Sequence, residues 1–184
     1  MDAERIAEGE NLVSEIEASA VDATWVEVEK VPDSRIQAEM ARVSRDQPEL
    51  LTFILGSAEG MGPGVSELAG LIFFVIWRVF RGETRGKMKP VTAAAIQRKL
   101  EQNERDLIRL DGMDPQAIDE ATIAELTRQP AIFGSMLEAI ASAQEDENEP
   151  LEISPEDKGS LILLLKTAID TLDDARDEAQ GKTA

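Results

Sequence analysis

The chain has 184 residues, long enough for one ordinary domain or two small ones. Its 37 Asp and Glu residues outnumber its 19 Lys and Arg residues, and the formal net charge of -18 disfavours direct binding to nucleic acid, because such binding depends on cations that displace counterions. Cys, His and Tyr are absent, which excludes disulfides, Cys/His zinc sites and most nucleophilic mechanisms, so we expect neither a cofactor nor catalysis.

The chain begins with "MDAERIAEGE", which contains no basic segment followed by an apolar stretch and therefore does not resemble a secretory signal. This predicts a cytoplasmic protein. Ile6, Val13, Ile16 and Ala20 then recur at helical spacing among acidic residues. That periodicity predicts a first amphipathic helix.

Residues 24–31, "TWVEVEKV", alternate apolar and charged side chains, as a half-buried strand does. No other segment offers this strand a partner. We therefore expect an extended connector whose Trp25 packs onto the helices, with a short strand as the alternative.

Residues 68–80, "LAGLIFFVIWRVF", form the most apolar run of the chain. The uncharged part lies between Glu67 and Arg78 and is too short for a membrane span, which needs about 20 apolar residues. A helix that is apolar on nearly every side is typical of a protein centre. The run therefore predicts a buried central helix and no membrane contact.

Several prolines stand where helices are expected to begin, a position at which the missing N–H has no intrahelical partner: Pro48, Pro115, Pro130 and Pro155. Asp114 and Ser154 precede two of them as expected N-caps, and Ser154 with Asp157 resembles a capping box. These signals predict helix boundaries along most of the chain.

An internal repeat relates the two halves of the sequence. "QPELLTFILGSA" begins at Gln47, and "QPAIFGSMLEAI" begins at Gln129, 82 positions later. "GLIFFVIWRVF" from Gly70 then aligns with "SLILLLKTAID" from Ser160, so that Leu71 aligns with Leu161. Such internal similarity at a fixed offset predicts a duplicated unit.

The repeat predicts an all-α protein of about eight helices, built from two tandem four-helix units. The units comprise residues 1–82 and 89–184, joined by a basic linker at 83–88. Units of this size have marginal cores alone, so we expect one compact pseudo-symmetric domain. Lys166 and Asp170 interrupt the second copy of the central helix, which predicts that this helix lies nearer the surface.

A metal site made only of carboxylates is the alternative that would make the protein a phosphohydrolase. Glu101 and Glu104 lie three apart on a helix whose apolar stripe contains Ile96, Leu100 and Asn103. Both acids lie off that stripe, as solvated residues do. A second acidic group lies near the end of the chain: Asp170, Asp173, Asp174 and Asp177.

A basic cluster follows the central run, although the chain is acidic overall: Arg78, Arg81, Arg85, Lys87 and Lys89. The structural interpretation is a linker that docks on the protein's own acidic helices, and the functional one is contact with an anion or an acidic partner. Between Gly56 and Gly64, glycines precede the central helix. We expect a flexible connection there, with phosphate binding at the helix N-terminus as the alternative.

These observations favour a non-enzymatic cytoplasmic protein that binds another protein, as an adaptor, inhibitor or chaperone does. The partner is not identified; acidic runs near the N-terminus and at residues 145–157 suit a basic one. The alternatives are the metal-dependent phosphohydrolase and an acidic mimic of nucleic acid. Trp25 and Phe80 are candidate apolar contacts for a homodimer.

Overall fold

The computed structural model describes residues 15–108 and 120–181, and within them it contains eight α-helices and no strand. This confirms the all-helical class. The helices, in chain order, are α1 (Ala18–Val28), α2 (Asp33–Asp46), α3 (Pro48–Ala58), α4 (Pro63–Glu83), α5 (Ala93–Ile108), α6 (Glu120–Leu126), α7 (Pro130–Gln144) and α8 (Pro155–Ala179).

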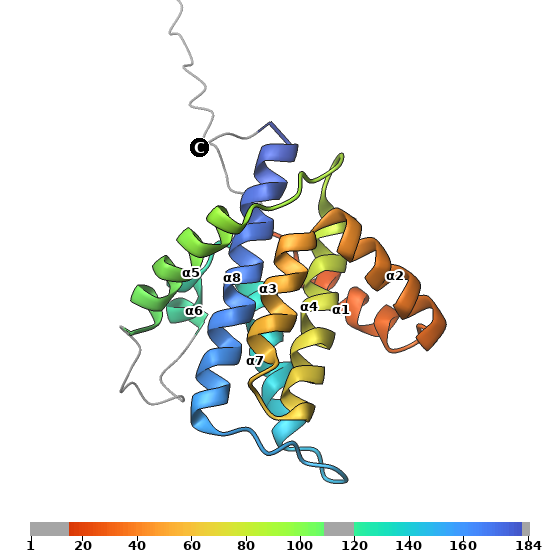
Figure 1. Cartoon of the computed structure of the whole chain (residues 1–184), viewed down its shortest axis with the longest axis vertical. Helices are drawn as coiled ribbons and strands as arrows, with labels where there is room; N and C mark the ends of the chain where they lie inside the picture. Colours follow the sequence, from red (N-terminus) through yellow and green to blue (C-terminus); the bar gives the residue numbers. More distant parts are fainter. Residues whose placement is uncertain (1–14, 109–119, 182–184) are drawn as a thin grey trace, which may run out of the picture.

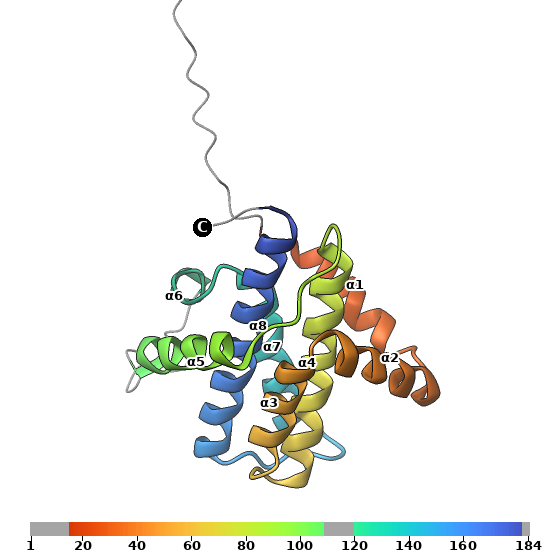
Figure 2. The same cartoon turned by 45° about the horizontal axis from the view of Figure 1, so that its top comes forward.

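Two long helices, α4 and α8, pack against each other at the centre of the molecule. Helices α3 and α7 contact both of them, while α1 packs on α4 and α5 packs on α8. Helices α2 and α6 pack on α3 and α7 respectively. As a result, α1 and α2 lie on one side of the central helices and α5 and α6 on the opposite side (Figure 1, Figure 2).

Helix α4 contains the apolar run, and its burial confirms the prediction of a central helix. From Ile72 to Phe80 every residue is buried except Arg78. None of the helices in the described ranges is both long and apolar enough to cross a membrane. Phe80 is fully enclosed in the core, so it provides no surface for the homodimer contact that the sequence suggested.

Helix α8 is buried along most of its length, and the prediction that it lies nearer the surface is wrong. Lys166 is only 1% exposed. Its Nζ donates to Asn103 Oδ1 at 2.7 Å and to Asp170 Oδ2 at 2.6 Å. A charge is tolerated in a protein interior when it is paired and hydrogen-bonded, and these two partners meet that condition.

Residues 24–28 belong to helix α1, so neither the extended connector nor the strand is found at that position. Val21 and Val28, seven residues apart, are the buried residues of this helix, whereas Val26 is exposed. The predicted role of Trp25 is confirmed. This side chain packs against the core, and its Nε1 donates to Ser135 Oγ at 2.6 Å.

The predicted helix starts at Pro48, Pro130 and Pro155 are confirmed. Ser154 Oγ accepts the backbone N–H of Asp157 at 3.0 Å, as an N-cap does. Along α5, Ile96 and Asn103 are buried as the apolar stripe predicted. The predictions for residues 6, 13, 114 and 115 lie outside the described parts of the chain.

Two glutamines occupy equivalent places immediately before α3 and α7. Gln47 (φ -141°, ψ 61°) and Gln129 (φ -126°, ψ 66°) have similar backbone conformations, and each side chain is 1% exposed. Gln47 Oε1 accepts the N–H of Val91 at 2.8 Å, just before α5. Gln129 Oε1 accepts the N–H of Ile16 at 2.9 Å, just before α1. Each glutamine therefore fixes the start of a helix in the other half of the chain.

Candidate anion-binding pocket

The five basic residues that the sequence singled out have different environments in the structure. Arg78 forms ion pairs with Glu27 at 2.9 Å and with Glu39 at 3.0 Å, and thereby ties α4 to α1 and α2. This residue thus pairs with the protein's own carboxylates, although it belongs to α4 and not to a linker. The other four are exposed and belong to the last turn of α4 or to the segment after it.

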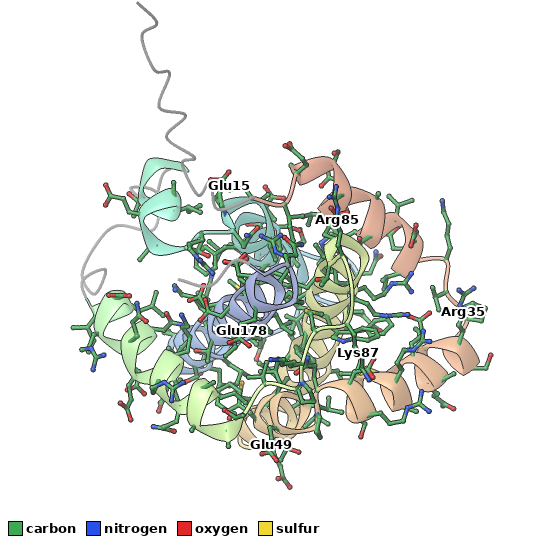
Figure 3. All side chains as sticks on the ribbon, turned by 90° about the horizontal axis from the view of Figure 1, so that it is seen from above. Glu15, Arg35, Glu49, Arg85, Lys87 and Glu178 are labelled. Carbon is green, nitrogen blue, oxygen red and sulfur yellow. The ribbon has the colours of Figure 1, made fainter. Side chains whose placement is uncertain are left out.

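Arg81 and Lys87 contribute to a pocket with a volume of about 540 Å³. Two further arginines, Arg42 and Arg45, reach it from the last part of α2. In the view along the long axis, Lys87 lies between α4 and α2, whereas Arg85 lies toward α1 (Figure 3). Arg85 and Lys89 do not line the pocket. The structure therefore places only part of the predicted basic cluster at one site.

The interior of the pocket is built from groups that the fold already holds in place. Trp77 is buried in the core, and the guanidinium of Arg81 lies 5.3 Å from the centre of its ring. Gln47 holds the segment between α4 and α5 by donating from Nε2 to the carbonyl of Lys89 at 3.1 Å. In the same segment Gly86 has φ +103°, a conformation that residues with side chains rarely adopt.

The charge of the pocket differs in sign from that of the protein. Its four cationic side chains have one acidic neighbour in the lining, Asp46. Among the described residues, no carboxylate lies within 4.0 Å of Arg42, Arg45, Arg81 or Lys87. Cations left without an internal partner are available to an anionic ligand, and arginine suits carboxylates and phosphates because its donors form a planar fork.

No known protein family, characterised protein or solved structure matches the chain. The function is therefore inferred from the geometry of the pocket.

Sequence reasoning missed Arg42 and Arg45. Residues three apart on a helix lie on the same face, so "RVSR" placed these two guanidinium groups together in α2. The sequence contained that signal, but it did not indicate which other element this face of α2 approaches. Only the packing of the helices brings α2 to Arg81 and Lys87.

The candidate metal residues Glu101 and Glu104 are both exposed on α5. Glu101 Oε1 accepts from Gln97 Nε2 at 3.0 Å. Within the described ranges, no three acidic side chains are grouped so that they can hold a metal ion. The structure thus adds no further ligand to this pair.

The acidic group on α8 is used for internal ion pairs. Asp173, which is buried, contacts Arg128 at 2.5 Å and Arg176 at 3.1 Å, and Asp174 pairs with Lys99 at 2.8 Å. Burial raises the pKa of Asp173, although the two guanidinium groups oppose that shift. Through Arg128 and Lys99, these carboxylates hold α8 against its neighbours.

The glycine-containing connection joins α3 to α4. Ser66 Oγ donates to the carbonyl of Ala58 at 2.5 Å, which ties the first turn of α4 to the end of α3. The hydroxyl is therefore engaged in holding the two helices together.

Proposed function

We propose that this is a non-enzymatic cytoplasmic protein that acts by binding another protein, and that anionic side chains of the partner enter the basic pocket. The observation that carries the proposal is the convergence of Arg42, Arg45, Arg81 and Lys87, none of which has a carboxylate partner among the described residues. In a protein with a net charge of -18, such a group is an exception to the overall charge distribution. Complementary charge favours both encounter and register between partners.

Affinity capture from a lysate of the source organism tests this proposal. The bait is the full-length protein, washed at low and at moderately high salt, and the retained proteins are identified by mass spectrometry. We expect a partner that is retained at low salt and released by salt, because screening weakens contacts between exposed charges.

A triple variant shows whether the pocket is responsible. Arg42→Gln, Arg45→Gln and Lys87→Gln together remove three exposed cations and leave Arg81 in contact with Trp77. We expect this variant to lose the partner. Exposed charges without ion pairs contribute within about 0.5 kcal/mol each to stability, so the variant should remain folded.

The matched control is a triple variant that removes the same charges elsewhere: Lys30→Gln, Arg98→Gln and Arg105→Gln. All three residues are exposed, none lines the pocket, and Arg105, like Arg45, lies in the last turn of its helix. It should retain the partner. If both triple variants retain the same proteins as the wild type, the pocket is not the binding site; if the wild type retains none, the binding proposal itself fails.

Two other functions remain predictions from the sequence. A phosphohydrolase using Glu101 and Glu104 requires that Mg²⁺ or Mn²⁺ raise the melting temperature and support hydrolysis of nucleotides. An acidic mimic of nucleic acid requires that DNA compete for the partner. The pocket supports neither function, because Glu101 and Glu104 do not line it and its positive charge is opposite to that of a nucleic-acid mimic.

We infer further that the eight helices are two duplicated four-helix units related by a pseudo-twofold axis. When α1 to α4 are exchanged with α5 to α8, each principal helix contact becomes another contact of the fold: α1 with α4 becomes α5 with α8, and α3 with α8 becomes α7 with α4. The reciprocal anchors at Gln47 and Gln129 obey the same exchange. The two glutamines are then expected to contribute similarly to stability.

A further inference from the structure

We propose that the group that the basic pocket accepts is a phosphorylated side chain of the partner, within a segment that is otherwise neutral or basic. This inference rests on the proposed function and specifies the chemistry of the same site. Its starting point is the lining: four cations, Arg42, Arg45, Arg81 and Lys87, against the single acid Asp46. The carboxylate of Asp46 can neutralise only one of the four cations, so the lining keeps a net positive charge.

A phosphate group suits this arrangement better than a carboxylate. It carries a charge of about -1.5 to -2 at pH 7 and three acceptor oxygens. The cations come from three directions, two from α2, one from α4 and one from the segment that follows α4. A tetrahedral group bound between them can accept from several donors, whereas a planar carboxylate has only two oxygens.

The charge of the remaining protein argues against an acidic segment as the ligand. The net charge of -18 repels a peptide that contains many Asp and Glu residues. A single phosphorylated residue instead concentrates its negative charge inside the pocket, and neutral or basic flanking residues avoid repulsion by the net negative charge of the protein. The partner is therefore expected to combine a negative phosphorylated residue with flanking residues that are not acidic.

The pocket also has the volume and the rigid walls that this ligand requires. Its volume of about 540 Å³ lies within the range of ligand sites, about 300 to 1,000 Å³, and exceeds what a lone phosphate ion needs. The buried indole of Trp77 and the two hydrogen bonds between Gln47 and the segment before α5 hold the walls in place. Binding therefore requires little ordering of the protein beyond the four long side chains.

The first test compares inorganic phosphate with acetate at equal ionic strength and pH 7.5, by NMR titration of the full-length protein. We expect phosphate to shift the amides around Arg42, Arg45 and Lys87 in a saturable manner, with an affinity at least about tenfold higher than that of acetate. The triple variant Arg42→Gln, Arg45→Gln and Lys87→Gln should lose the response. The control Lys30→Gln, Arg98→Gln and Arg105→Gln should retain it. Equal affinities for the two anions would contradict the preference for phosphate.

The second test identifies the source of the phosphate. Three fluorescent peptide libraries with random neutral and basic flanks carry phosphoserine, glutamate or serine at the centre, and their binding is followed by anisotropy. We expect the phosphoserine library to bind at least about tenfold more tightly than the glutamate library, with the same dependence on the two triple variants.

The outcomes separate the two proposals. If glutamate and phosphoserine libraries bind equally, the pocket binds a partner but does not select phosphate, so only this inference fails. If neither library binds while vesicles containing phosphorylated phosphatidylinositol do, the ligand is a lipid headgroup and the phosphopeptide is wrong. If inorganic phosphate and nucleotides bind but no peptide does, the ligand is a small phosphorylated molecule, and affinity capture decides separately whether any protein partner exists.

Discussion

Leu161→Ala is expected to lower the free energy of unfolding by about 3 kcal/mol, within the range of about 2.7 to 5 kcal/mol for buried leucines. Leu161 is completely buried near the start of α8, a helix that packs on α3, α4, α5 and α7. Removing its side chain reduces the apolar area that folding buries and leaves a cavity in the core. The measurement is chemical denaturation followed by circular dichroism.

Leu71→Ala provides the matched control, because the repeat aligns Leu71 with Leu161. Leu71 is 43% exposed on α4, so its removal is expected to cost less than about 1 kcal/mol. The sequence alone gives the two leucines the same role, whereas the structure distinguishes them. Similar losses at both positions would show that the two central helices are not packed as described.

The replacements Gln47→Ala and Gln129→Ala are each expected to destabilise the protein by about 2 to 4 kcal/mol, because an unsatisfied buried polar group costs about 1 to 3 kcal/mol. The first leaves the carbonyl of Lys89 and the N–H of Val91 without their partner. The second removes the partner of the N–H of Ile16 and one hydrogen bond to Asp173 Oδ1. Denaturation measures the loss, and hydrogen exchange should accelerate at Val91 and Ile16 respectively.

Gln37→Ala serves as the control for these replacements, since Gln37 is exposed on α2. It should change stability by no more than about 0.5 kcal/mol, and alanine favours the helix slightly. Similar losses for the two buried glutamines are expected if the halves of the fold are equivalent. A large loss at one glutamine and none at the other would contradict that equivalence.

The elements that were predicted correctly depend on local chemistry. Proline at the first position of a helix needs no tertiary partner, which explains the correct starts of α3, α7 and α8. The run that forms α4 is apolar on almost every side, so any compact arrangement of the chain must bury it. The same reasoning placed Glu101 and Glu104 on the exposed side of α5.

The incorrect predictions concern segments in which a local pattern competed with tertiary contacts. Residues 24–28 alternate like a strand, yet Val21, Trp25 and Val28 also recur at helical spacing, and packing against α4 and α7 selects the helix. The charge of Lys166, taken without its partners, predicted a position near the surface. Asn103, from α5, is one of the partners that permit its burial.

The sequence by itself determined the helical class, the starts of α3, α7 and α8 and the burial of the central apolar run, because these depend on spacing and backbone chemistry within a few residues. Only the tertiary structure decided which of the basic residues act together. Arg78 is paired with Glu27 and Glu39, whereas Arg81 and Lys87 join two arginines from α2 that lie far away in the chain. Charges interact through space over a few ångströms, so their grouping follows from helix packing and not from their order in the sequence.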